Sequence, residues 1–320
     1  NQLILAPSIG SKCKIISLMG EVEVRIWLLI WLILHVHKNE SIFVYHSQRI
    51  MIPVYIASKI KRFRYFLEVE ELYYKFGFCS KRMARNEKKV IMSANALIVS
   101  TENIVKELGY RKKAIYLHGN YQNLRIHEAW EKNESKEKKV VFAGGIETVR
   151  NTAFNVCDCA EWLDDQFTIY LLGYGDENAI IQLQTKIEKI NRKLGKKKLI
   201  YCGTKTGNDY DRFMSGCDIA INFQNMDEHY MKFAFPSKVL NYLNYGLTVV
   251  TTPLDSIRNS EIDHLVQYPE NMENTPKAFA TKINTLNVDR MNEIKKREEE
   301  MDRLDQKFVV ELSYFIDSEE

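Results

Sequence analysis

A nineteen-residue stretch, Phe235–Pro253, contains the residue types needed to bind a phosphate group. Its sequence is FPSKVLNYLNYGLTVVTTP. The fixed φ of Pro236 suits the first turn of a helix, where free backbone N–H groups can bind an anion. Lys238 adds a positive charge at the same place. We therefore predict that Ser237 and Lys238 contact a phosphate group.

The rest of this stretch predicts a helix followed by a strand. Apolar residues at helical spacing begin at Val239, Gly246 is typical of a helix C-terminus, and Leu247–Thr252 reads as a short buried strand. The stretch resembles the donor-site segment of family-4-type glycosyltransferases of GT-B architecture, which often carry Pro-Ser-Lys, Glu-Tyr-Leu and a Gly followed by two valines. The alternative is an ordinary helix–strand unit of an α/β domain.

Glycines follow the other predicted strands of the second half of the chain. The strands Lys139–Ala143, Thr168–Leu172 and Leu199–Cys202 alternate with helical patterns, which predicts a parallel sheet with ligands at the carboxyl ends of its strands. Glycine there lets the backbone approach a phosphate closely. With the resemblance, these positions imply a donor-binding set: Gly144, Gly145, Arg150, Gly173, Gly175, Gly203, Ser237, Lys238 and Asn241.

Two of these positions depart from the pattern of the resembled family. Gly145 stands where an Arg is usual, and Arg150 matches a Lys at the start of the next helix, so the resemblance implies Arg150 as a diphosphate ligand. A surface Arg is the alternative. Asn241 replaces the carboxylate that usually binds the ribose hydroxyls. An amide can hydrogen-bond a diol, but without the charge-assisted strength of a carboxylate.

The first half of the chain predicts a second α/β domain with candidate catalytic residues. Its expected strands are Ser41–Tyr45, Arg64–Leu67, Ala96–Val99 and Ala114–Leu117. The segment from Tyr65 to Tyr73, YFLEVEELY, resembles a segment of exopolysaccharide glycosyltransferases that faces the donor sugar. This resemblance implies that Glu68 steers or deprotonates the acceptor hydroxyl. Glu70 and His46 are further candidates; an acidic helix N-terminus and a structural histidine are the alternatives.

These patterns predict an α/β protein of GT-B fold, with two Rossmann-like domains facing across a cleft. Residues 1–125 form the acceptor-side domain, 126–290 the donor domain, and 291–320 a last helix that crosses back to the first domain. The polar, charged stretch Arg125–Lys138 is the expected linker. No Gly-rich turn precedes Lys12. We therefore expect the first domain to be incomplete at its start.

Composition excludes several protein classes. The 320 residues are 45% hydrophobic and 27% charged, which is typical of a globular protein large enough for two domains. The longest apolar run, Ile26–Leu34, has nine residues and favours a buried helix over an interfacial anchor. The cysteines form no CxxC pair, so we expect neither zinc nor disulfides and a reduced, cytoplasmic protein. They are Cys13, Cys79, Cys157, Cys159, Cys202 and Cys217.

Charge is distributed unevenly along the chain. Residues 1–113 contain 19 Lys and Arg, 9 Glu and no Asp, a net charge of +10, whereas the whole chain has +3. Such a basic half favours an anionic membrane leaflet or a phosphate-bearing acceptor. Nucleic acid is the competing reading, but no nucleic-acid module is visible, so we expect no nucleic acid as partner. The sharpest basic cluster is Lys59, Lys61, Arg62 and Arg64, for which a solvated face is the alternative.

The resemblance implies a retaining, metal-independent hexosyltransferase of bacterial capsule, exopolysaccharide or O-antigen synthesis. It would move a sugar from a nucleotide-diphosphate sugar to a lipid-linked oligosaccharide, as a peripheral protein on the inner membrane face. We expect no cofactor and no metal, because we interpret the sequence as lacking an Asp-x-Asp motif of the type that holds a divalent metal in the other large glycosyltransferase architecture. The alternatives are an NDP-sugar epimerase and a catalytically silent GT-B subunit that supports a partner transferase. Asn241, in place of the usual carboxylate, is the reason to consider the silent subunit.

Overall fold

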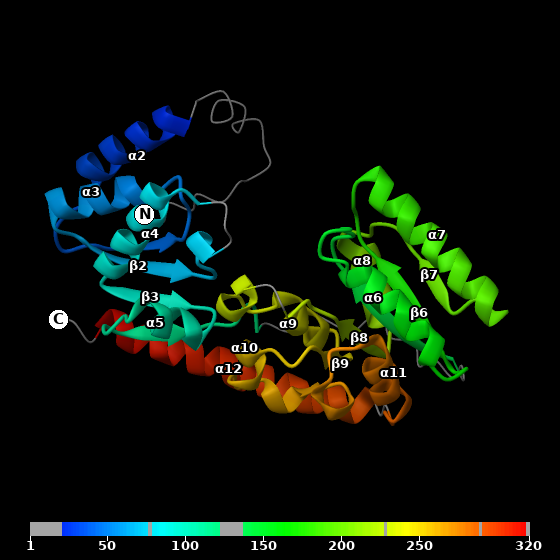
Figure 1. Ribbon diagram of the computed structural model, residues 1–320. Coiled ribbons are helices and arrows are strands. Elements are labelled where there is room, and N and C mark those ends of the chain that lie inside the picture. Colours follow the sequence, from blue (N-terminus) through cyan, green and yellow to red (C-terminus); the bar gives the residue numbers. More distant parts are fainter. Residues whose placement is uncertain (1–20, 76–78, 122–136, 227–228, 288–289, 318–320) are drawn as a thin grey trace. The chain divides into compact units, whose positions relative to one another are not determined.

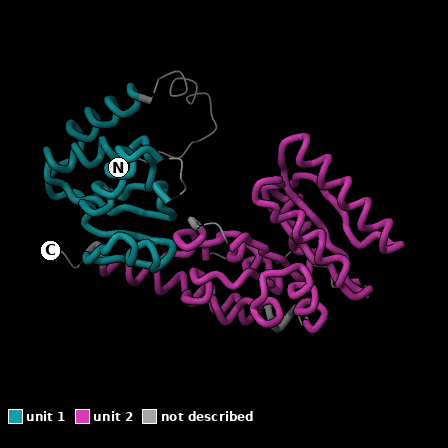
Figure 2. Tube along the Cα trace, in the orientation of Figure 1, with its two compact units in different colours: residues 1–116 teal, residues 117–320 magenta. Residues whose placement is uncertain are grey.

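The computed structural model describes residues 21–75, 79–121, 137–226, 229–287 and 290–317. The chain divides into two compact units, residues 1–116 and 117–320 (Figure 2). Most of the predicted linker, 125–138, lies outside the described residues, as does the region before residue 21. The domain boundaries and the crossing of the last helix therefore stay predictions.

Unit 1 is built on a parallel sheet of four strands in the order β1-β2-β3-β4 (Figure 1). Sequential order with a helix between successive strands is the pattern of repeated βαβ units. The buried centre of the sheet is apolar, with Leu67 and Leu97 fully enclosed. The strands are β1 (Ser41–Tyr45), β2 (Arg64–Val69), β3 (Ala96–Val99) and β4 (Ala114–Tyr116), and the helices are α2 (Glu21–His35), α3 (Met51–Lys61), α4 (Lys81–Ser93) and α5 (Glu102–Leu108).

Strand β2 is two residues longer than predicted. We expected it to end at Leu67, with Glu68 as the first residue beyond it, and this was wrong. Glu68 lies inside β2, opposite Tyr45 of β1 and Ile98 of β3. Val69 is fully buried, so the strand continues through the carboxylate to complete its apolar side. Glu70 is the first residue after the strand.

Unit 2 contains a parallel sheet of six strands in the order β10-β9-β8-β5-β6-β7. Strand β5 lies in the middle, because it pairs with β6 on one side and with β8 on the other. Apolar clusters cover both faces of the sheet. The strands are β5 (Lys138–Ala143), β6 (Phe167–Leu172), β7 (Leu199–Tyr201), β8 (Ile219–Asn222), β9 (Thr248–Thr251) and β10 (Val266–Gln267).

The predicted helices of unit 2 lie close to their expected positions, whereas the helices Asp255–Arg258 and Pro276–Asn284 were not predicted. The helix predicted from Asn151 to Leu163 ends at Cys159 and continues as a 3-10 turn, Ala160–Trp162. Each remaining predicted element of this unit begins and ends within about three residues of its expected bounds. The helices are α6 (Thr152–Cys159), α7 (Glu177–Leu194), α8 (Gly207–Ser215), α9 (Ser237–Asn244), α10 (Asp255–Arg258), α11 (Pro276–Asn284) and α12 (Arg290–Asp317).

Helix α9 is fixed in unit 2 by α12. Met301 and Leu304 of α12 are buried in the same cluster as α9, and the guanidinium of Arg297 donates to the Leu247 carbonyl. Gly246 ends α9 with a φ of +69°, and a Cβ there would come within 3.0 Å of the Ile294 side chain. Glycine is thus required both by the turn and by the approach of α12.

Candidate functional site

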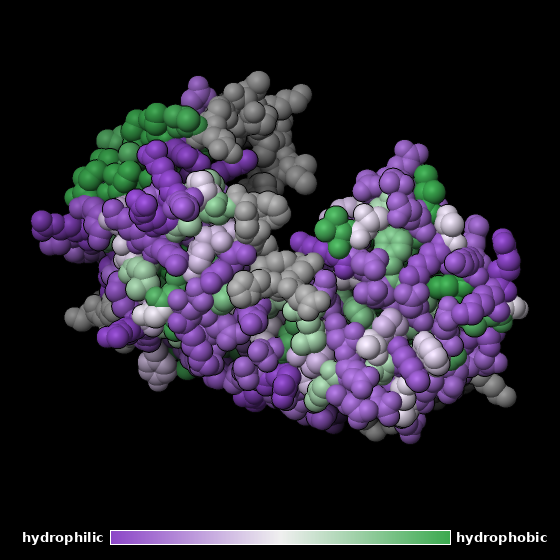
Figure 3. Space-filling model, in the orientation of Figure 1, coloured by the Kyte–Doolittle hydropathy of each residue, from purple (hydrophilic) through white to green (hydrophobic). Residues whose placement is uncertain are grey.

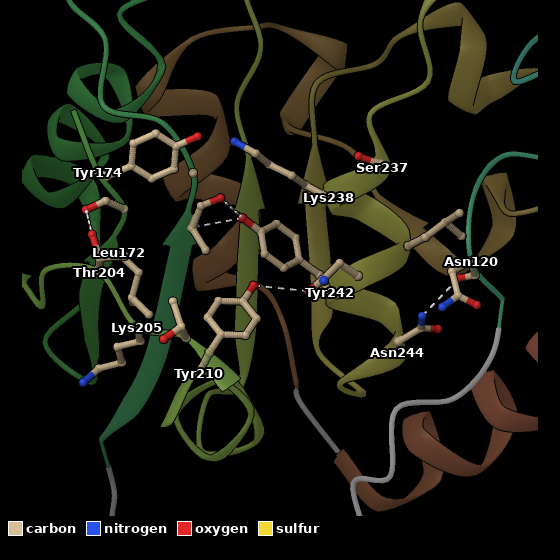
Figure 4. Close-up of a pocket in the computed structure, with 16 residues that line it drawn as sticks. Asn120, Leu172, Tyr174, Thr204, Lys205, Tyr210, Ser237, Lys238, Tyr242 and Asn244 are labelled. Carbon is tan, nitrogen blue, oxygen red and sulfur yellow. Dashed lines mark hydrogen bonds between the residues drawn. The ribbon is translucent and has the colours of Figure 1, made fainter. Parts of the chain in front are cut away.

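A pocket of about 510 Å³ lies in unit 2 at the carboxyl ends of β5, β6 and β7, beside the first turns of α9 (Figure 4). The carboxyl edge of a parallel sheet is where α/β proteins bind ligands. Backbone glycines, hydroxyls, amides and two lysines line it. The lining residues are Asn120, Ala143, Gly144, Leu172, Gly173, Tyr174, Thr204, Lys205, Thr206, Tyr210, Ser237, Lys238, Leu240, Asn241, Tyr242 and Asn244.

Lys238 brings a largely enclosed positive charge to this pocket. Its ammonium lies 5.1 Å from the centre of the Phe142 ring, and a Cβ on Gly144 would lie within 3.0 Å of it. Burial lowers the Lys238 pKa, the nearby Arg150 lowers it further, and Glu147 opposes both. Among the residues that the structure describes, no carboxylate forms a salt bridge with Lys238. A buried cation without a paired anion is a site for an anionic ligand.

The glycines at the ends of β5 and β6 let two loops touch backbone to backbone. A Cβ on Gly173, whose φ is +153°, would come within 3.0 Å of the Gly144 carbonyl oxygen. A Cβ on Gly175 would come within 3.0 Å of the Ile146 carbonyl oxygen. The Ile146 N–H donates to the Tyr174 carbonyl at 2.8 Å. A side chain at either position would force these loops apart, and the floor of the pocket depends on their contact.

Two tyrosines set the position of α9 relative to β5 and α8. The buried Tyr242 hydroxyl accepts from the Ala143 N–H at 2.9 Å and donates to the Ala143 carbonyl at 3.0 Å. The Tyr210 hydroxyl donates to Asn241 Oδ1 at 3.3 Å. Figure 4 shows Tyr210 and Tyr242 beside the pocket. The Asn241 amide oxygen thus accepts one of the two hydrogen bonds that it can accept, and within the described residues its N–H groups have no hydrogen-bond partner, so both ends of the amide are available to a ligand.

The structure brings five of the nine predicted donor residues into the pocket lining: Gly144, Gly173, Ser237, Lys238 and Asn241. Gly145, Gly175 and Gly203 lie next to lining residues without lining the pocket themselves. Arg150 is half exposed, 3.4 Å from Glu147 through its Nε, and it is close enough to Lys238 to lower the pKa of that lysine. Its role as a diphosphate ligand stays a prediction.

Several lining residues were missed by the sequence argument. Thr204, Lys205 and Thr206 follow β7, and the strand-end rule that selected Gly203 could have selected them. Asn120 follows the predicted strand Ala114–Leu117, so the same rule could have selected it. Asn244 gave no such signal, because its amide reaches the Asn120 carbonyl, 3.1 Å away, across 124 residues of sequence. Asn244 Oδ1 is buried and has no hydrogen-bond partner within the described part of the chain. A ligand hydroxyl could satisfy it.

The acidic candidates of unit 1 lie at the carboxyl ends of β1 and β2. Glu70 accepts a 2.7 Å hydrogen bond from the Tyr45 hydroxyl, which raises the Tyr45 pKa. Burial raises the Glu68 pKa, and the neighbouring Glu70 charge raises it further. A carboxylate with a raised pKa is a better proton acceptor, which is compatible with the predicted role of Glu68.

His46 has a different environment from the one expected of a catalytic base. Its side chain is only 2% exposed, it stacks on Tyr73 with 4.5 Å between ring centres, and its Nε2 lies 3.3 Å from Glu87 Oε1. Glu87 also accepts from the backbone N–H groups of Tyr73 and Tyr74. This burial favours a structural role, and the catalytic role of His46 stays a prediction.

One acidic motif was passed over in the sequence argument. Asp209-Tyr210-Asp211 is an Asp-x-Asp triplet, and it lies in α8. The Asp211 carboxylate accepts from the Tyr245 hydroxyl, so it is part of the packing of α8 on α9. A search of the described residues finds no group of three or more His, Cys, Asp or Glu side chains arranged to hold a metal ion.

Comparison with known proteins was made at the levels of sequence and fold. No protein-family model matches the chain, and no curated protein matches its sequence. Solved structures do match. HepE from Anabaena, in complex with UDP and glucose, has a TM-score of 0.63 at 15% identity, over 89% of this chain and 81% of that one. The chain has the GT-B fold.

Two further solved structures are similar to this chain. One is described as trehalose-6-phosphate from E. coli bound with UDP-2-fluoro glucose, with a TM-score of 0.67 at 10% identity, over 93% of this chain and 78% of that one. The other is an alpha,alpha-trehalose-phosphate synthase (UDP-forming) from Burkholderia vietnamiensis, with a TM-score of 0.62 at 11% identity, over 92% of this chain and 79% of that one. At these identities the likeness establishes the fold alone.

Proposed function

We propose that this protein is a glycosyltransferase that takes its sugar from a nucleoside diphosphate sugar bound in the unit 2 pocket. The observation that carries the proposal is the Lys238 ammonium, which is largely buried, lies against the Gly144 backbone and has no carboxylate partner among the described residues. A diphosphate there would supply the missing negative charge and would also accept from the N–H groups at the start of α9. The similar HepE structure contains UDP and glucose.

The further details of the proposal come from the sequence resemblance. We propose transfer with retention of anomeric configuration, without a metal ion, to a lipid-linked glycan acceptor of bacterial surface polysaccharide synthesis at the inner face of the membrane. Phosphate charge that grows as the donor bond breaks would then be stabilised by Lys238 and backbone N–H groups. Glu68 would steer or deprotonate the acceptor hydroxyl.

The test of donor binding is thermal stabilisation of the protein by UDP, GDP, ADP, dTDP and CMP, one at a time. A ligand that binds only the native state raises the melting temperature. We expect a selective rise with one diphosphate, and its loss in Lys238→Met. If no nucleotide raises the melting temperature of the folded protein, the transferase proposal is refuted.

A catalytically silent binding subunit is the second candidate, and Asn241 favours it. Its amide oxygen accepts from the Tyr210 hydroxyl, and no carboxylate of the described residues lines the pocket to hold a ribose diol. The two candidate functions differ in whether the protein converts a donor sugar into products. With the stabilising nucleotide identified, release of free nucleotide from the corresponding donor sugar supports the transferase. Tight nucleotide binding without any transfer or donor hydrolysis supports the silent subunit.

A further inference from the structure

Helix α2 exposes an apolar strip that nothing in the described structure covers. The helix packs on α3, and Leu28, Leu32 and Val36, one turn apart, are buried. The opposite side is also apolar. Its large side chains are between 49% and 67% exposed: Val22, Ile26, Trp27, Ile30 and Leu34. Figure 3 shows this strip as a hydrophobic area over α2. A helix that is apolar all round is expected in contact with a second apolar phase.

Helix α3, which packs on α2, also exposes apolar side chains, and basic side chains lie near them. Ile56 and Ile60 of α3 are 38% and 57% exposed. Between them lies Lys59, whose ammonium is 5.5 Å from the centre of the Tyr55 ring, and Lys89 of α4 lies 5.0 Å from the same ring. Lys112 lies close enough to Lys59 for its pKa to be lowered, mainly by burial and in part by that charge.

The positive charges of this border have no acidic partners in the described structure. No carboxylate among the described residues forms a salt bridge with Lys59, Lys61 or Arg62, which end α3 and follow it. Helix α4, which packs on α3, adds exposed basic residues: Lys81, Arg82, Arg85, Lys88 and Lys89. The one exposed acid described on α2 is Glu23, at its N-terminal end.

We propose that the outer side of α2 and α3 docks unit 1 on an anionic lipid bilayer. The apolar strip would enter the boundary between headgroups and acyl chains, with Trp27 at headgroup level, and the basic border would meet the lipid phosphates. The 15 residues of α2 make a helix about 22 Å long, which suits a helix lying in the interface plane. Within the described residues, no helix is long and apolar enough to cross a membrane.

Charge favours a bilayer over a second copy of the chain as the occupant of this surface. Residues 1–113 have 19 Lys and Arg against 9 Glu and no Asp, so two copies meeting at this surface would bring like charges together. Anionic headgroups supply the opposite charge. The proposal deepens the proposed function, since a lipid-linked acceptor resides in a bilayer, but its test requires no nucleotide and no transfer. Either can therefore fail alone.

The test is co-sedimentation of the protein with vesicles of phosphatidylcholine alone and of phosphatidylcholine mixed equally with phosphatidylglycerol. We expect at least about tenfold stronger binding to the mixed vesicles at low salt, because basic residues near an anionic surface strengthen binding. The double variant Ile26→Glu, Ile30→Glu should lose binding by more than about tenfold. The double variant Lys59→Gln, Lys61→Gln should lose most of the preference for anionic lipid.

The matched control is Ile181→Glu on α7. Ile181 and Ile26 are both 54% exposed, so Ile181→Glu matches the single substitution Ile26→Glu, which is measured beside the double variant, in charge and in accessibility. The control should bind mixed vesicles as the unchanged protein does. A second measurement needs no charged variant: vesicles with brominated acyl chains should quench the fluorescence of the unchanged protein more than that of Trp27→Phe.

Four results would overturn the proposal. The folded protein could fail to bind mixed vesicles, or the Ile26→Glu, Ile30→Glu variant could bind them unchanged. Light scattering without lipid could instead show a dimer that this variant dissociates, which would assign the strip to a second copy. Equal quenching with and without Trp27 would likewise exclude insertion of α2.

Discussion

Lys238 should act in opposite directions on ligand binding and on stability, and Lys238→Met separates the two. The Lys238 ammonium is partly buried and has no paired carboxylate among the described residues, and its pKa is lowered, chiefly by burial. The charged form is therefore disfavoured in the folded protein. Methionine fills similar space beside Phe142 without the charge. We expect a higher melting temperature for the ligand-free variant than for the unchanged protein.

The same substitution should weaken diphosphate binding. A hydrogen bond between charged partners contributes about 1.5–3 kcal/mol, which corresponds to a loss of about 10- to 150-fold in affinity. Calorimetry with the stabilising nucleoside diphosphate measures this loss, and differential scanning of the ligand-free proteins measures the stability. The control is Lys205→Met, which removes a charge from the opposite wall of the pocket, beside Phe213.

The pH dependence has a definite sign. Because the folded-state pKa of Lys238 lies below its ordinary value of 10.5, its destabilising effect is complete below the folded pKa and disappears as the pH rises to 10.5. The stability difference between Lys238→Met and the unchanged protein should shrink over that window. Nucleotide affinity should fall in the same window in the unchanged protein alone. Reduced ligand-free stability together with unchanged affinity in Lys238→Met would refute the assignment.

Four further substitutions test the site. Gly144→Ala should weaken nucleotide binding more than it lowers stability, because the new methyl group displaces the Lys238 ammonium. Gly173→Ala should lower the melting temperature, because its methyl group would collide with the backbone of Gly144. Calorimetry measures the first effect and thermal unfolding the second. Tyr242→Phe leaves the buried Ala143 N–H and carbonyl unpaired and should cost about 1–3 kcal/mol in chemical denaturation. Glu68→Gln should abolish transfer without changing nucleotide affinity. It should also raise the melting temperature at neutral pH, a gain that vanishes below the ordinary Glu pKa of 4.5, since the raised pKa makes the ionised form unfavourable in the folded state.

The sequence was sufficient to predict the strands that carry the pocket, since each is a short apolar run ended by glycine. Lys238 and Ser237 were found because proline at a helix start is a local signal. Tyr210 and Asn244 were not predicted as pocket residues, because their place in the pocket depends on contacts over 31 residues to Asn241 and over 124 residues to Asn120. Contacts between residues so far apart leave no periodic pattern in the sequence.

The error at Glu68 has a similar cause. A carboxylate is unfavourable in a strand interior, so the local pattern ended β2 before it. The parallel register with β1 and β3 continues the strand through Glu68 to Val69. For His46 the local prediction was right, since it follows β1 as expected. Its enclosure by Tyr73 and Glu87 could not be predicted, because it depends on residues distant in sequence.

The central position of β5 has a consequence for how the protein folds. Strands β5, β6 and β7 are neighbours in sequence, but the other wall of the pocket arrives only when β8 joins β5, as in the bond between the Lys139 N–H and the Asp218 carboxylate across 79 residues. Closing such a long loop is slow compared with forming a local βαβ unit. The pocket should thus be among the last parts of unit 2 to form. A nucleotide that recognises only the finished pocket would slow unfolding while leaving the folding rate unchanged.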